Sequence, residues 1–163
     1  MTFRIMAVVC LCLFASPALA DWQGTIVEAS GGGDILTVHT NDNRNLILQL
    51  YGIDCPELGQ PYGKEAQQKV YDLVVKPGKP VVVLEERRDS TGQIFATIIL
   101  HDNTTLNARL LLAGLAWVYT PNCVDTQYCQ AMIKLQTKAQ SAKIGLWADE
   151  NPIPPWEWKR DNQ

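Results

Sequence analysis

Short apolar stretches separated by polar and glycine-rich turns dominate residues 21–100. Within them, β-branched and other apolar residues alternate with polar ones, which is typical of half-buried β-strands. Gly31–Gly33 precedes one stretch and Asn41–Asn43 follows it, and both segments supply turn residues. We therefore expect a hairpin over 35–53. The predicted strands cover 22–29, 35–40, 46–53, 80–86 and 94–100.

Helical spacing of apolar residues begins after the third predicted strand. Between Pro61 and Val75 they recur at intervals of four, four and three, and Pro77 follows as a stop signal. These apolar residues are Tyr62, Ala66, Val70 and Leu73. The spacing predicts a helix over 61–75.

Two further helices are predicted in the last third of the chain. Thr105 can cap a short helix, and Asp125 can cap a longer one that ends at Gly145. The longer helix has one apolar face, made of Tyr128, Met132, Leu135, Ala139 and Ala142. The tail after it contains three prolines and two tryptophans, and we expect it to lie extended against the body.

The order of these elements predicts the fold class. Three strands, a helix, two strands and then helices suit an α+β protein built on a five-stranded OB-fold-type β-barrel. The order alone leaves other mixed folds open.

The N-terminal segment predicts export. Arg4 precedes an apolar run, and Ala18-Leu19-Ala20 places small residues at the two positions that a signal peptidase reads. We expect a signal peptide over 1–20 with cleavage after Ala20, and one domain over 21–163, located in the periplasm or outside the cell. The run is short for a transmembrane helix and no other stretch is apolar enough to span a bilayer, so no membrane partner is expected.

Net charge changes the expected partners. The chain has 14 Lys+Arg and 17 Asp+Glu, and loss of Arg4 with the signal peptide leaves 13 against 17, a net charge of −4. A mildly acidic protein repels polyanions at long range, so tight nucleic-acid binding needs a local basic patch. The chain has one dense basic stretch, and its simplest interpretation is a solvated face. It consists of Lys64, Lys69, Lys76, Lys79, Arg87 and Arg88.

Three cysteines remain once the signal peptide is removed. Cys123 and Cys129 are six residues apart and are expected to form a disulfide outside the cytoplasm, with two reduced thiols as the alternative. Cys55 is then the odd thiol. A nucleophilic role for Cys55, with His39 or His101 as base, stays open, whereas no histidine lies close enough in sequence to predict a zinc site.

The stretch YGIDCPELGQPYG at 51–63 concentrates acidic residues beside an apolar strand. Asp54 and Glu57 lie three residues apart around a proline. Such carboxylates can hold a metal ion and activate a water molecule. The alternative interpretation is a capped turn that leads into a helix.

Five stretches of the chain resemble the staphylococcal nuclease, or thermonuclease, family. They are GGGDILTV (31–38), YGIDCPELGQPYGKEAQ (51–67), STGQIFATIIL (90–100), LNARLLLAGLAWVY (106–119) and AKIGLWADENPIPPWEW (142–158). Together they cover nearly the whole of residues 21–163, in order. The resemblance implies a five-stranded barrel with three helices, and calcium-dependent hydrolysis of DNA and RNA.

The resemblance also assigns the acidic half of a nuclease site. The family has a metal-binding Asp-Gly-Asp-Thr turn, and this chain keeps Asp34 there but has Gly32 for the first acid and Ile35 for the threonine. Oxygen ligands of this kind suit Ca²⁺. The other matched positions are Asp54 for the second metal aspartate, Cys55 for a backbone carbonyl in the metal shell, and Glu57 for the general base.

The basic half departs from the family. A family arginine stands five residues before the second aspartate, where this chain has Gln49. A second family arginine follows a Tyr-Gly pair, where this chain has Gln93 after Thr91-Gly92. Loss of one positioned donor to an oxyanion costs about 10²–10³ in rate. We therefore expect hydrolysis to be slower by several orders of magnitude, or lost.

Three functions follow from this comparison. The first is an exported nuclease-family protein with weak or lost hydrolysis, in effect a pseudoenzyme. The second is an active but atypical nuclease. The third is a non-catalytic binding module that uses the barrel face for an oligonucleotide or a protein. The net charge and the absent arginines weaken phosphate binding and favour a protein or small-ligand partner in the third case. We expect a monomer.

Overall fold

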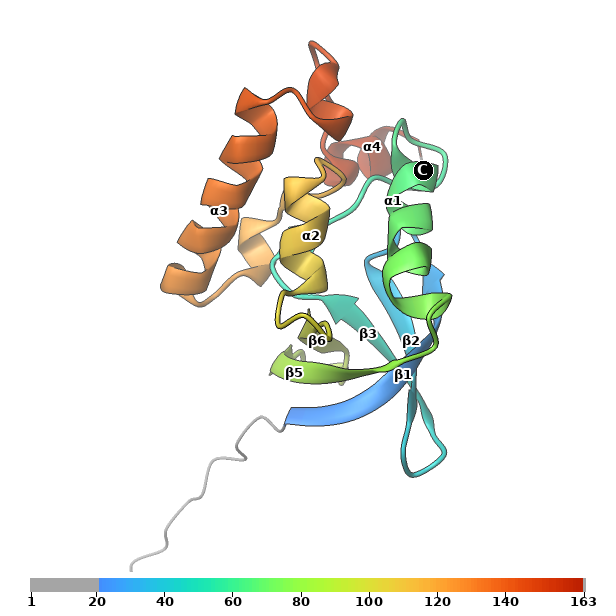
Figure 1. Ribbon diagram of the computed structural model, residues 1–163. Coiled ribbons are helices and arrows are strands. Elements are labelled where there is room, and N and C mark those ends of the chain that lie inside the picture. The colour runs from blue at the N-terminus through green and yellow to red at the C-terminus, as the bar shows by residue number, and fades with distance from the viewer. Residues whose placement is uncertain (1–20, 163) are drawn as a thin grey trace, which may run out of the picture.

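The computed structural model describes residues 21–162 and consists of a small β-barrel with helices packed over it (Figure 1). Five strands close the barrel in the order β1-β2-β3-β6-β5. The α+β class and the five-stranded barrel predicted from the sequence are therefore confirmed. The barrel strands are β1 (Asp21–Ser30), β2 (Ile35–Thr40), β3 (Asn45–Leu50), β5 (Pro80–Arg88) and β6 (Ile94–Ile99).

Strand β1 closes the barrel because it pairs along both of its edges. It runs antiparallel to β2 on one side and to β5 on the other. Strands β2 and β3 form the predicted hairpin, while β3 and β6 pair in parallel. Register shifts interrupt β1 at Ile26/Glu28 and β5 at Glu85/Arg87. Such bulges increase local twist, which suits a small closed barrel.

Alternation along the strands separates the core from the surface. In β2, Leu36 and Val38 are fully buried and point into the barrel. In β3, Leu48 and Leu50 are buried while Ile47 is 59% exposed. This pattern matches the period of two that predicted these strands.

Four α-helices cover the barrel. They are α1 (Gly63–Val70), α2 (Leu106–Leu112), α3 (Thr126–Ser141) and α4 (Pro155–Asp161). Helix α1 continues as a π-turn, η1 (Tyr71–Val75), so the predicted helix over 61–75 is confirmed in a modified form. The caps are as predicted: Thr105 accepts a hydrogen bond at the start of α2, and Asp125 accepts two at the start of α3. Short 3₁₀ turns lie at η2 (Thr120–Asn122) and η3 (Gly145–Ala148).

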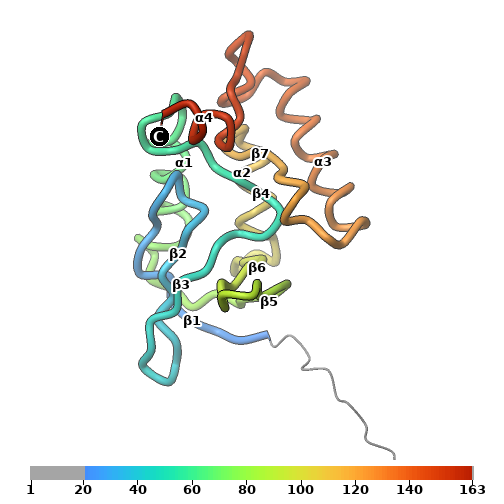
Figure 2. The backbone as a smooth tube through the Cα atoms, turned by 180° about the vertical axis from the view of Figure 1, so that it is seen from behind, coloured from blue at the N-terminus to red at the C-terminus, as the bar shows by residue number. Residues whose placement is uncertain are grey.

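Three sequence predictions differ from the structure, and the first is the end of α3, which lies at Ser141 and not at Gly145. The third predicted strand ends at Leu50, because Gly52 turns the chain with a φ of 71°, and a short strand β4 (Ile53–Asp54) follows. Figure 2 shows β4 beside β7 (Trp117–Val118), with which it pairs. The extended tail is wrong for its last part, because Pro155 starts α4, where a proline at the first helical position is favourable. The three helices implied by the family resemblance thus become four.

A buried tyrosine anchors the start of α3 to the barrel. The hydroxyl of Tyr51 accepts hydrogen bonds from the backbone amides of Val124 at 2.6 Å and Asp125 at 3.1 Å. In the same region the sulfur atoms of Cys123 and Cys129 are joined at 2.03 Å. The segment before α3 is therefore held to the barrel by the Tyr51 hydroxyl and to α3 by the disulfide.

The predicted signal peptide over 1–20 lies outside the described residues. Within residues 21–162, no helix has the length and apolar character needed to cross a membrane.

Candidate active site

Three carboxylates meet where two turns of the barrel come together. Asp34 ends the turn between β1 and β2, and its backbone carbonyl accepts a hydrogen bond from the amide of Leu50 at 2.8 Å. Asp54 ends β4, and Glu57 follows in the loop before α1. Asp34 and Asp54 are 2% and 5% exposed, so both acids lie in the protein interior. The structure thus brings together the three acids that the sequence singled out.

Gln49 lies beside this acid group. Its side-chain amide donates to Oδ2 of Asp34 at 3.3 Å. Residue 49 therefore reaches the acids from β3, as the family comparison implied, but it offers a neutral amide in place of a guanidinium. A glutamine can orient a carboxylate, but it cannot neutralise one.

The loop that carries Glu57 runs between two glycine backbones. A Cβ atom placed on Gly32 would lie 1.7 Å from the carbonyl oxygen of Pro56. A Cβ atom placed on Gly63 would lie 1.8 Å from the carbonyl oxygen of Glu57. Position 32, where the family has its first aspartate, is therefore filled by the acidic loop itself.

A lysine from the far end of the chain completes the site. The ammonium of Lys159, on α4, lies 2.9 Å from Oε1 of Glu57 and 3.3 Å from Oδ1 of Asp54. The Lys159 side chain is 39% exposed, whereas that of Asp54 is 6% exposed. One cation thus bridges two of the three acids from the open side of the site.

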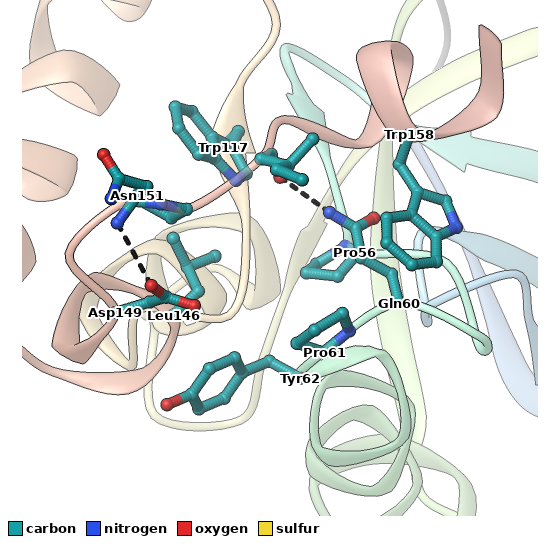
Figure 3. A pocket seen from close by; sticks show the side chains of 11 residues that line it. Pro56, Gln60, Pro61, Tyr62, Trp117, Leu146, Asp149, Asn151 and Trp158 are labelled. Carbon is teal, nitrogen blue, oxygen red and sulfur yellow. Dashed lines mark hydrogen bonds between the residues drawn. The ribbon is translucent and has the colours of Figure 1, made fainter. Parts of the chain in front are cut away.

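Packing places α4 in this position. The side chain of Gln60 donates to the carbonyl of Ile153 at 2.6 Å and accepts from the amide of Glu57 at 3.1 Å. Figure 3 shows Trp158 beside Pro56 and Gln60 in a small pocket of about 60 Å³. The tail is therefore bonded directly to the acidic loop.

Aromatic contacts hold the other side of α4. The ring of Trp156 lies 5.9 Å from that of Trp117 and 5.3 Å from that of Tyr119, measured between centroids. Trp117 also packs on Trp147 at 4.3 Å. These tryptophans and Tyr119 therefore pack against one another.

The electrostatics of the site reflect burial and crowding. Burial, followed by the neighbouring charge of Asp54, raises the pKa of Asp34 to about 7. Burial also raises the pKa of Asp54, against the effect of Lys159. Burial alone would lower the pKa of Lys159, but its hydrogen bond to Glu57 and the charge of Asp54 outweigh this and raise it. Lys159 is accordingly held as an ammonium ion.

These residues do not fit a resident calcium ion. Calcium takes about 6–8 oxygen ligands, whereas residues 21–162 hold no group of three or more His, Cys, Asp or Glu side chains arranged to bind a metal. The family is generally calcium-dependent. Here the carbonyl of Pro56 fills the space beside Gly32, and the ammonium of Lys159 lies against two of the acids.

The second glutamine and the nearby arginines make their contacts elsewhere. The side-chain amide of Gln93 donates to the carbonyl of Ile94 at 3.1 Å, within its own turn. Arg88 pairs with Glu85. The guanidinium of Arg87 lies 4.4 Å above the ring of Phe95. In the family pattern, position 93 belongs to the same site as the acids. Here Gln93 makes its hydrogen bonds within its own turn, and among the described residues it makes none to the three acids.

The thiol of Cys55 is unsuited to nucleophilic attack. Its side chain is fully buried, and burial raises its pKa well above the ordinary value. His39 bonds to Asn45 in the β2–β3 hairpin at 2.9 Å. His101 follows β6. The buried, protonated thiol does not support the open alternative of a Cys–His pair.

Lys159 is the site residue that sequence reasoning missed. It is separated from Asp54 by 105 residues, and it matches none of the family positions used above. The prolines of the tail predict an extended segment, which offers no helix to carry a side chain back to the acids.

Comparison with known proteins agrees with this architecture. The family model described as "Staphylococcal nuclease homologue" matches residues 47–149. An Escherichia coli protein described as an uncharacterized endonuclease is 34% identical over 151 residues, which cover 91% of this chain and 93% of that protein. The micrococcal nuclease of Shigella flexneri is 29% identical over 165 residues, which cover 96% and 91%. The chain therefore belongs to the staphylococcal nuclease family.

Proposed function

We propose that the protein is an exported member of the nuclease family whose cleft hydrolyses phosphodiesters weakly or not at all. The observation that carries this proposal is the contact of Gln49 with Asp34. The residue that reaches the acids from β3 is a neutral amide, at the position where the family has an arginine. Export rests on the signal-peptide pattern of residues 1–20.

The chemistry of phosphoryl transfer explains why this exchange matters. A phosphodiester is an anion, and charge on its oxygens increases in the transition state. Positively charged clamps stabilise that charge and can be worth about 10³–10⁵ in rate. In this cleft Glu57 can still orient a water molecule, but it is paired with Lys159 at 2.9 Å. The acidic half remains while the guanidinium half is absent.

A second function, binding without hydrolysis, is supported by one row of residues on the barrel. Gln49 on β3, Phe95 on β6 and Arg87 on β5 are direct neighbours in the strand register. Arg87 stacks over Phe95 at 4.4 Å. Phe95 is buried beneath Arg87, so this row offers a single strand the partly exposed guanidinium of Arg87 and the amide of Gln49. The net charge of −4 favours a short or weakly bound ligand over a long polyanion.

The proposal is tested by measuring hydrolysis of single-stranded DNA. Purified 21–163 with millimolar calcium is expected to act at least about 10³-fold more slowly than a family member that carries both arginines. Rates within tenfold of that relative would refute the proposal. Fluorescence anisotropy with a labelled oligonucleotide in chelator measures binding separately, because no hydrolysis then disturbs the signal.

A double variant measures how much of the deficit comes from the missing clamp. Gln49→Arg with Gln93→Arg restores both guanidinium groups. Gln130→Arg with Gln140→Arg adds the same charge to exposed positions of α3 and serves as the matched control. A hydrolysis rate above that of this control measures how much of the rate deficit comes from the missing arginines. The rate deficit that remains is assigned to the acidic half of the site.

A further inference from the structure

We propose that Lys159 is a built-in cation that takes the electrostatic place of a divalent metal and keeps calcium out of the acid cluster. The inference rests on the proposed function, because it concerns the cleft to which that function assigns weak hydrolysis. It goes beyond that function by naming Lys159 as the residue that determines which cation the acid cluster binds.

The contacts of Lys159 are those of a counter-ion in a mostly buried site. Its Nζ lies 3.3 Å from Oδ1 of Asp54 and 2.9 Å from Oε1 of Glu57. Asp34 is close enough to Asp54 for the charges of the two buried acids to repel each other. Buried charges of one sign are costly unless a cation balances them. Lys159 supplies that cation from within the chain.

The position of Lys159 does not depend on its own ion pairs. Trp158, the residue before it, lines the pocket with Pro56, and Trp156 packs against Trp117 and Tyr119. Gln60 bonds the tail to the acidic loop through the carbonyl of Ile153. Since these contacts fix α4, the backbone of Lys159 is already placed beside the acids before any ligand arrives.

An ammonium in this place competes with calcium for the same oxygens. Calcium requires carboxylate oxygens at about 2.3–2.6 Å, and one oxygen of Asp54 and one of Glu57 already lie against the ammonium of Lys159. A second cation beside the ammonium would also be repelled, because like charges a few ångströms apart in a partly buried site are only partly screened. The proposal therefore predicts that removal of the lysine charge opens the cluster to metal.

The experiment is a calorimetric titration of calcium into 21–163 at neutral pH and low salt. Lys159→Met is expected to bind calcium at least about tenfold more tightly than the wild type, or about 1.4 kcal/mol. Arg160→Met is the matched control, because it removes one positive charge from the next residue of α4. Arg160 is largely exposed and pairs only with the neighbouring Asp161 among the described residues. The control is expected to bind calcium as the wild type does.

Two results would overturn the proposal. One is a Lys159→Met affinity no greater than that of Arg160→Met. The other is tight calcium binding by the wild type that the Lys159 variant leaves unchanged. Lys159→Gln, which keeps a long polar side chain, repeats the titration if the methionine variant shows a changed thermal unfolding midpoint. The titration contains no nucleic acid, so rapid DNA hydrolysis by the wild type would refute the proposed function without deciding this inference.

Discussion

The close approach of Gly32 to the acidic loop leads to a sharp prediction for stability. The perturbation is Gly32→Ala, which adds a single methyl group. That Cβ would lie 1.7 Å from the carbonyl oxygen of Pro56 and 2.8 Å from its carbonyl carbon. The atoms it meets are backbone, so no side-chain rotation can relieve the overlap, and the segment around Pro56 has to move.

The magnitude follows from the size of that overlap. Adding a methyl group to a well-packed site costs about 1–3 kcal/mol and occasionally more. Because the obstacle here is a main-chain carbonyl, we expect the upper value, about 3 kcal/mol. For a domain of this size each kcal/mol lowers the melting temperature by about 2–4 °C, so a fall of about 6–12 °C is expected. The φ of Gly32 is not among the positive values of the chain, so backbone strain does not add to the effect.

The assay is thermal and urea unfolding of the variant beside Gly59→Ala. A Cβ on Gly59 meets no atom within 4 Å, and its φ is not positive. Both substitutions reduce the freedom of the unfolded chain alike, so their difference isolates the clash. The control should stay within about 0.5 kcal/mol of the wild type. Equal stability of the two variants would refute the reasoning, and with it the claim that the acidic loop excludes an aspartate at position 32.

Two tyrosines carry the remaining predictions. Tyr51→Phe removes the acceptor of two backbone amides at the start of α3 and should lower the free energy of unfolding by about 1–3 kcal/mol in urea, while exposed Tyr71→Phe should have no measurable effect. A destabilisation equal to that of the exposed control would contradict this account. Burial raises the pKa of Tyr128 from 10.0 to about 12. The neutral form is favoured in the folded state, so this stabilisation is complete below pH about 10 and is lost as the pH rises towards 12. Tyr128→Phe should remove this part of the loss of stability at alkaline pH, which is checked by measuring unfolding free energies between pH 8 and 12. A variant whose unfolding free energy falls as steeply with pH as that of the wild type would contradict this account.

The barrel could be predicted from the sequence because its signals are local. Leu36, Val38 and Leu48 alternate with polar neighbours, and this period of two specifies which face is buried. Thr105 and Asp125 were recognised as caps because a helix start depends on only a few adjacent residues. Family motifs then placed the three acids in one cleft.

The remainder of the site depends on contacts between distant parts of the chain. Gly32 could be seen to lack an acid, but the filling of that space by the carbonyl of Pro56 follows from how two loops pack. Lys159 reaches Asp54 only because α4 docks on Trp117 and Tyr119. No local pattern encodes such docking, and the prolines of the tail pointed towards an extended segment.

The distance along the chain between the acids and their cation also sets the order in which the cleft can be completed. Lys159 follows Asp54 by 105 residues. All five barrel strands lie before residue 100, so the barrel can form before α4 docks and brings the lysine to the acids. Until then the carboxylates must either stay in water or be protonated as the barrel closes around them. The cleft is therefore completed only as a late step of folding, and a chain shortened before residue 159 would keep its barrel strands but would leave Asp54 and Glu57 without their cation.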